Sequence, residues 1–125
     1  MAGSLTIDNI NGKVISSSPV ATENQVIGIG QTWQDVTASR TAGTTYTNST
    51  GKPICISVSG TRNSNVGPGA FELIINNVSV GYAASSEAQT SWNALRETIF
   101  GVIPNGGTYY INNTNSIINT WSELR

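Results

Sequence analysis

The chain has 125 residues, of which six are basic, seven are acidic and none is histidine, so its formal net charge is −1. This length is typical of one domain, and the balanced charge lacks the clustered Lys and Arg that bind nucleic acid or an anionic membrane. The missing histidine and the single cysteine exclude the commonest general base, a disulfide within the chain and a thiolate metal cluster.

Only 10% of the residues are charged, well below the roughly 25% of an average soluble domain. The surface is therefore expected to be neutral and rich in the hydrogen-bonding groups of Ser, Thr and Asn. The first residues lack the positive and apolar regions of a signal peptide, and no run approaches the ~20 apolar residues of a membrane helix. We expect synthesis in the cytoplasm and no insertion into a membrane.

The first predicted element is a hairpin over residues 5–16, with Asn11 and Gly12 at its tip. Residues 17–29 show no clear period and are interpreted as a connector. We therefore divide the chain into an N-terminal arm, residues 1–28, and a body, residues 29–125.

Alternating side chains predict most of the body to be strands. Residues 53–59 alternate with period two, and residues 71–75 and 78–82 do so on either side of Asn76 and Asn77, which predicts a tight hairpin. A further hairpin is predicted with residues 104–107 as its turn. Residues 116–125 alternate only partly. The weak helical pattern of residues 86–97 is interpreted in its second half as the beginning of a strand.

Several short strands with frequent turns are typical of an antiparallel β-sandwich or barrel. The body is therefore predicted to be an all-β, small antiparallel β-sandwich. Cys55 lies in an apolar run and is interpreted as a small buried hydrophobe, although an intermolecular disulfide or a reactive thiol stays open. Sequons at Asn48, Asn77 and Asn112 are attributed to the Asn-, Ser- and Thr-rich composition.

No catalytic, cofactor or metal site is predicted. A nucleophile would lack a histidine base, and the scattered acids, interpreted as solvated or ion-paired at the surface, have no glycosidase or calcium-loop spacing. These acids are Asp35, Glu72, Glu87, Glu97 and Glu123. Aromatic side chains suit stacking on sugars, but a Trp is more often core or subunit interface because it buries a large area. Adjacent Tyr109 and Tyr110 must point to opposite faces of a strand, one of them buried.

Five sequence blocks in order resemble a domain near the C-termini of tailed-phage tail fibres and related prophage products. The blocks are GQTWQDVTASR, GTTYTNSTGKPICISVS, ELIINNVSVG, VIPNGGTYYI and TWSELR, and they span about residues 29–125. The resemblance implies a β-sandwich, jelly-roll-like and trimeric, that attaches to a host surface structure. It implies no catalytic residue and no cofactor.

The resemblance makes the first and last blocks scaffold and the loops recognition elements. The scaffold or interface candidates are Trp33, Asp35, Arg40, Trp121 and Leu124. We expect Trp33 to pack on the sandwich, and Asp35 or Arg40 to pair with a neighbouring strand or subunit, including the terminal TWSELR. The recognition candidates are Arg62, Asn63 and Asn65 in loop 60–70, and Trp92, which directly follows loop 85–91.

Two functions stay open for this sequence. The first is a trimeric virion adhesin that binds a host polysaccharide or an outer-membrane receptor. The second is a capsid decoration or head-fibre protein that docks on other virion proteins through its arm. Only 28 residues precede the body, too few for the long stalk of a fibre protein, so we expect a short standalone virion protein or a fibre tip.

Overall fold

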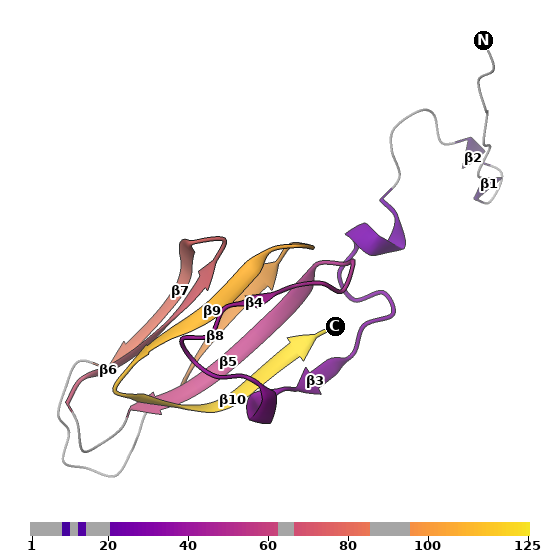
Figure 1. Cartoon of the computed structure of the whole chain (residues 1–125). Helices are drawn as coiled ribbons and strands as arrows, with labels where there is room; N and C mark the ends of the chain where they lie inside the picture. The colour runs from indigo at the N-terminus through magenta and orange to yellow at the C-terminus, as the bar shows by residue number, and fades with distance from the viewer. Residues whose placement is uncertain (1–8, 11–12, 15–20, 63–66, 86–95) are drawn as a thin grey trace.

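The structure is a computed structural model that describes residues 9–10, 13–14, 21–62, 67–85 and 96–125. It is all-β, and two four-stranded antiparallel sheets pack as a sandwich (Figure 1). The eight strands of the sandwich are β3 (Trp33–Asp35), β4 (Tyr46–Thr47), β5 (Ile54–Arg62), β6 (Gly69–Ile75), β7 (Val78–Ser85), β8 (Arg96–Ile103), β9 (Thr108–Thr114) and β10 (Ser116–Leu124). Two short 3-10 turns are also present, η1 (Glu23–Gln25) in the arm and η2 (Thr37–Ser39) in the body, and the described residues contain no α-helix.

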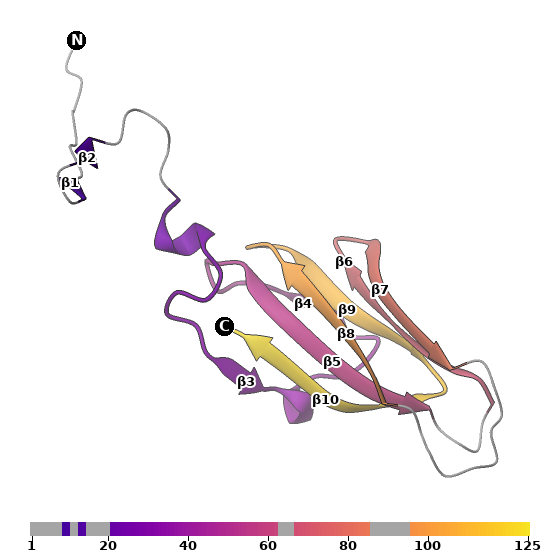
Figure 2. The ribbon, with the colours of Figure 1, turned by 180° about the vertical axis from the view of Figure 1, so that it is seen from behind.

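The strands pair in a nested order. One sheet, which we call the β10 sheet, has the order β3-β10-β5-β8, and the other, the β9 sheet, has the order β4-β9-β6-β7. The first strand of the sandwich thus pairs with the last, β4 with β9, β5 with β8, and β6 with β7. The chain is a long antiparallel ribbon rolled so that its successive strand pairs lie alternately in the two sheets, with the C-terminus beside β3 (Figure 2).

The core lies between the two sheets and is built from alternate residues of the central strands. β6 shows the pattern most clearly, because Phe71, Leu73 and Ile75 are buried while the residues between them are partly exposed. The alternation predicted for residues 53–59 is confirmed in β5, whose Ile54, Ile56 and Val58 reach the core. The other large core residues are Ile99, Ile103, Tyr109, Ile111 and Trp121.

The hairpin predicted around Asn76 and Asn77 is confirmed. The two residues have φ angles of 49° and 63° and join β6 to β7, with Ile75 opposite Val78. Asn tolerates this left-handed conformation better than most residues, and two such residues in succession match the right-handed twist of the flanking strands.

The hairpin predicted around residues 104–107 is wrong, although the turn is present. Gly107 N donates to Pro104 O at 2.9 Å, but β8 pairs with β5 in one sheet and β9 pairs with β6 and β4 in the other. The turn therefore carries the chain from one sheet to the other. Local sequence predicts the reversal, whereas the hydrogen-bond partners of both strands come from distant segments.

The partial alternation at the C-terminus has a cause in β10. Its register against β5 shifts between Ile118 and Thr120, so a bulge separates Ile118, which packs against the core, from the buried Trp121. One extra residue at a bulge displaces every later side chain by one position.

The N-terminal hairpin prediction agrees with a two-stranded sheet of its own. β1 (Asn9–Ile10) pairs with β2 (Lys13–Val14), and Ile10 lies opposite Lys13. Most of the weak helical pattern of residues 86–97, namely residues 86–95, lies outside the described residues. β8 begins at Arg96.

Candidate functional site

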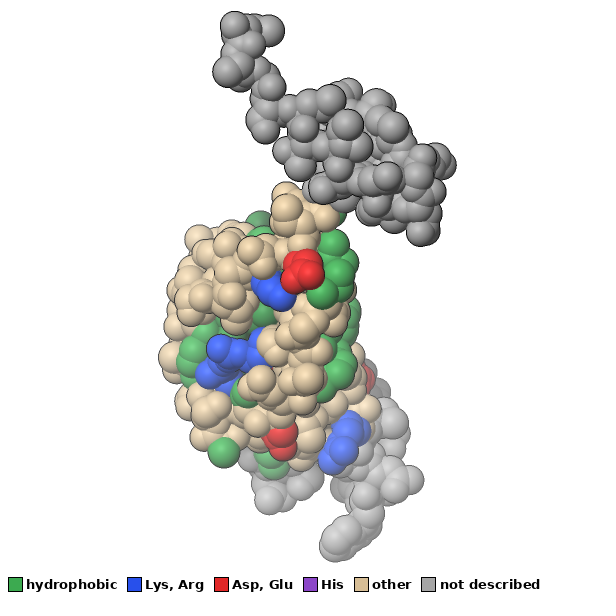
Figure 3. All heavy atoms as spheres, turned by 90° about the vertical axis from the view of Figure 1, so that its right-hand side faces the viewer, with side chains coloured by type: hydrophobic (Ala, Val, Ile, Leu, Met, Phe, Trp, Pro, Cys, Tyr) green, Lys and Arg blue, Asp and Glu red, His purple; other side chains and the backbone are tan. Residues whose placement is uncertain are grey.

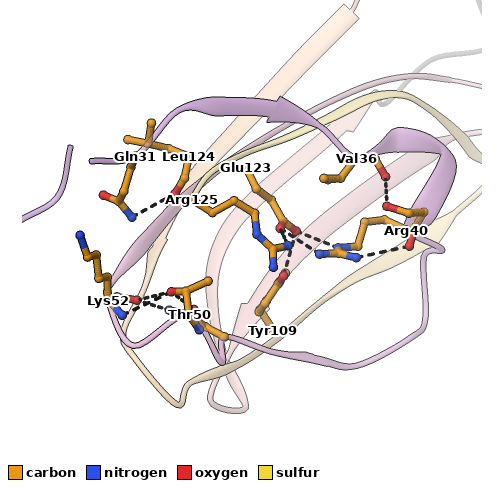
Figure 4. A network of polar contacts seen from close by, with 11 residues as sticks. Gln31, Val36, Arg40, Thr50, Lys52, Tyr109, Glu123, Leu124 and Arg125 are labelled. Atoms are coloured by element: carbon orange, nitrogen blue, oxygen red, sulfur yellow. Dashed lines mark hydrogen bonds and ion pairs between the residues drawn. The ribbon is translucent and has the colours of Figure 1, made fainter. Parts of the chain in front are cut away.

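The most elaborate polar site surrounds a fully buried carboxylate at the C-terminal end of β10. Because Trp121 points into the core, Glu123 two residues later does so too, and both are at most 1% exposed. Glu123 Oε1 accepts from Arg40 Nε and Tyr109 Oη, each at 2.8 Å. Glu123 Oε2 accepts from Arg40 Nη2 at 2.9 Å and from Arg125 Nη1 at 2.8 Å. Figure 4 shows these donors converging on the carboxylate.

The surroundings decide the charge of this carboxylate. Burial by itself raises the pKa of Glu123, but the hydrogen bonds from Arg40 and Tyr109, together with the charges of Arg40 and Arg125, outweigh it and hold the pKa below the ordinary range. Burial, and then the hydrogen bond to Glu123, raises the pKa of Tyr109 to about 12. The site is therefore an ionised carboxylate with a neutral phenol.

Aromatic rings complete the cluster around Arg40. The guanidinium carbon lies 4.5 Å from the centroid of the Tyr46 ring, within reach of a cation–π interaction. Tyr46 in turn packs against Tyr109 and edge-on against Trp121, with centroid distances of 5.9 and 6.1 Å. The cluster joins β4, β9 and β10 to the segment after β3. Its carboxylate is shielded from solvent and saturated with donors, so it stabilises the fold and is not available to a substrate.

The structure brings together two parts of the predicted scaffold. Arg40 pairs with Glu123 in the terminal TWSELR block, as expected, and Trp121 lies in the core. Asp35 does not pair with a neighbouring strand, because its Oδ1 accepts from Thr37 N and Thr37 Oγ1 at 3.0 and 2.6 Å. The hydrogen bond from the Thr37 hydroxyl, followed by that from its amide, lowers the pKa of Asp35.

The expectation that Trp33 packs on the sandwich is wrong. Trp33 is opposite Leu124 in the β3–β10 register, and Leu124 points outward because its neighbour Glu123 points inward. The indole is accordingly 52% exposed on the outer face of the β10 sheet. Trp33 and Asp35 lie opposite Leu124 and Ser122 and share one face, as alternation along a strand requires, and that face is the outer one.

Cys55 also lies on this outer face, between Leu124 and Val102 in the register. It is nevertheless buried, as predicted, by its neighbours. Burial raises the pKa of its thiol, which favours the unreactive protonated form.

The two predicted recognition loops leave one end of the sandwich. Thr61 pairs with Arg96, and Gly69 pairs with Ser85, so the strand ends that flank both loops lie together. Asn63, Asn65 and Trp92 themselves lie outside the described residues. Arg62 is the last residue of β5, opposite Ser116, and its side chain lies outside them too.

The arm joins the sandwich at the opposite end. Gln31 Nε2 donates to Pro53 O at 2.8 Å and to Leu124 O at 3.4 Å, while its Oε1 accepts from Gly28 N at 2.7 Å. Lys52 Nζ donates to Ile29 O at 3.1 Å. These contacts fasten the segment before β3 beside the start of β5 and the end of β10 (Figures 1 and 4).

Asn48 was not singled out as a structural residue, yet it organises this end. It is 2% exposed, and its amide donates to Lys52 O, Ile103 O and Pro104 O at 2.7 to 3.2 Å. A buried, hydrogen-bonded amide is not a glycan acceptor, which agrees with the interpretation of this sequon as compositional.

The prediction that the acidic residues lie at the surface is wrong for Glu123, which is fully buried. The signal that would have found it is its spacing from Trp121, since a strand residue two positions from a core tryptophan shares its face. An inward-facing acid then requires a cationic partner, and Arg40 and Arg125 are among the six basic residues.

Comparison of the sequence with protein-family models and with curated proteins finds no match. Among the described residues, no three His, Cys, Asp or Glu side chains are grouped as metal ligands. The described part of the chain also contains no helix of the length and apolarity needed to cross a membrane.

Proposed function

We propose that this chain is a virion protein of a tailed bacteriophage that attaches the particle to a structure on the host surface. The proposed role is binding without catalysis or a cofactor. The observation that carries it is that the two ends of the sandwich differ. Both candidate recognition loops leave one end, and the arm joins the other. A protein that holds a particle at one end and a receptor at the other requires this separation.

The strand order supports the proposal at the level of the fold. Eight strands in two four-stranded sheets, paired in nested order, fit a jelly roll, an architecture used by viral capsid proteins and by lectins. We extend the proposal to a homotrimer by the resemblance to tail-fibre tips.

The experiment that tests the adhesin is binding of the labelled protein to a panel of bacterial strains and to their purified surface polysaccharides. We expect binding by the full chain and by a variant lacking residues 1–20. Replacing residues 63–66 with Gly and Ser should abolish binding and leave the circular dichroism spectrum unchanged. If no strain or polysaccharide binds, or if the loop replacement binds normally, the adhesin proposal fails.

A second candidate is a decoration or head-fibre protein that docks on the capsid. It is favoured by the arm, whose β1 and β2 form a sheet separate from the two sheets of the sandwich. Sedimentation with purified phage heads tests it, with the variant lacking residues 1–20 as the control. Binding to heads that is lost with the arm supports decoration, and failure of the full chain to sediment with heads contradicts it.

A further inference from the structure

The outer face of the β10 sheet has the composition of an interface. Trp33, Phe100, Val102 and Ile117 point outward from it, and each is between 45% and 55% exposed. In the part of this face that the structure describes, the only charged residues are Asp35 on the edge strand β3 and Arg96 at the first position of β8. Both lie at the rim, and depletion of charge from the centre is the compositional mark of a protein interface.

The polar groups in the centre of this face are hydroxyls, some of which are already paired. Ser59 Oγ and Thr98 Oγ1 lie 2.8 Å apart across β5 and β8. Burying hydroxyls that bond each other costs less than burying unpaired ones. Only 10% of the residues of the chain are charged, and on the side of the molecule seen in Figure 3 the charged side chains are separated by uncharged areas. Among its described residues, the outer face of the β10 sheet has no cationic cluster for an acidic partner.

The face is also complementary to itself. One row across the four strands reads Trp33, Leu124, Cys55 and Val102, so an apolar side chain stands at each edge of the sheet at the same height. A second copy rotated about an axis parallel to the strands brings its β8 edge against the β3 edge of the first. Trp33 then meets Val102, with Phe100 on the next row. Rotation about an axis across the strands would place this apolar row against the end that carries Arg96.

The size of the face suits such a contact. The strands β3, β10, β5 and β8 have 3, 9, 9 and 8 residues, and at ~4.8 Å between strands and ~3.3 Å per residue they cover about 450 Å² in plan. Because side chains project from the sheet, its accessible surface area exceeds this plan area and approaches the ~800 Å² that each partner contributes to a standard interface.

We propose that copies of this chain associate through the outer face of the β10 sheet, around an axis parallel to the strands, with Trp33 of one copy against Phe100 and Val102 of the next. This inference rests on the self-association in the proposed function and names its surface. The same axis keeps all recognition loops at one end of the assembly and all arms at the other, which a parallel fibre tip requires.

Sedimentation velocity of the full chain from 1 to 100 μM, compared with Phe100→Glu, tests the surface. A charge buried unpaired in an interface weakens binding by several kcal/mol. We therefore expect the dissociation constant for self-association to be about 100-fold or more higher for the variant than for the parent. The matched control is Tyr82→Glu, which changes an exposed aromatic residue on β7, the edge strand of the other sheet. It should assemble like the parent, and circular dichroism should show both variants folded.

Crosslinking tests the orientation. In a Cys55→Ser background, Trp33→Cys with Val102→Cys should be joined between copies by a short bis-maleimide, whereas Trp33→Cys with Tyr82→Cys should not. A monomeric parent at 100 μM would overturn the proposal, as would an oligomer that survives Phe100→Glu or yields no Trp33–Val102 crosslink. An oligomer that survives Phe100→Glu would refute this surface while leaving self-association and receptor binding intact.

Discussion

At the scale of single residues, Glu123 shows how one side chain ties distant segments together. Its carboxylate accepts from residues 40, 109 and 125, which lie on three different parts of the chain. A buried carboxylate is tolerable only with such compensation, and its removal leaves the cations uncompensated.

We therefore expect Glu123→Gln to destabilise the protein by about 3 kcal/mol, because the neutral amide leaves the largely buried Arg40 without its counter-charge. Urea unfolding followed by fluorescence measures the effect. Glu72→Gln is the control, since Glu72 is a partly exposed outward residue of β6, opposite Tyr82, and its change should stay within about 0.5 kcal/mol. Equal effects of the two substitutions would contradict the structural role of Glu123.

The same residue predicts how stability depends on pH. The pKa of Glu123 is lower in the folded than in the unfolded protein, so as the pH falls the unfolded state takes up the proton first. Its contribution is complete above the ordinary glutamate pKa of about 4.3 and is lost as the pH falls through the folded pKa. Urea midpoints between pH 7 and pH 3 should fall less steeply in Glu123→Gln than in the parent. Parallel pH profiles would show that another group governs acid unfolding.

At the scale of elements, the two sheets approach closely where β8 crosses the core side of β6. A Cβ on Gly101 would lie 2.5 Å from Leu73 Cδ2 and 3.2 Å from Ile75 Cδ1, and both residues are buried. The absence of a side chain at Gly101 is therefore a condition of the inter-sheet packing.

We expect Gly101→Ala to cost about 1–3 kcal/mol, because the added methyl group forces the core apart. Gly81→Ala is the matched control, since its Cβ would meet Ile99 at an ordinary contact distance of 3.4 Å. Thermal unfolding compares the two variants. A Gly101→Ala protein as stable as Gly81→Ala would mean that Leu73 has room to move.

At the scale of the whole molecule, the sandwich has a fastened end and an end from which the candidate recognition loops leave. Gln31 contributes to this difference between the two ends by holding residues 28–31 against the start of β5 and the end of β10. Without this anchor the arm would leave the body at a variable angle, which a docking element should not do.

We expect Gln31→Ala to speed thermolysin cleavage beside the exposed Ile27 and Ile29, while the sandwich loses only about 1–2 kcal/mol for the missing hydrogen bonds. Gln34→Ala, an exposed glutamine three positions on in β3, serves as the control and should be cleaved at the parental rate. If both variants are cleaved equally, Gln31 does not anchor the arm.

The sequence by itself determined the features that depend on near neighbours. Alternation predicted the strand over 53–59, and Asn76 with Asn77 predicted the turn between the strands over 71–75 and 78–82, because backbone preference and period two act within a few residues. The missing histidine and the low charge likewise led to the expectation, without a fold, of no histidine-based site and no phosphate-binding surface.

Tertiary structure alone decided which face is covered and which strands pair. Alternation showed that Trp33 and Asp35 share a face, but only the inward position of Glu123 on the neighbouring strand placed that face outside. The turn at 104–107 was readable, yet the separation of β8 and β9 into different sheets depends on β5 and β6 as partners. Such pairings join residues far apart in the chain, so no local pattern encodes them.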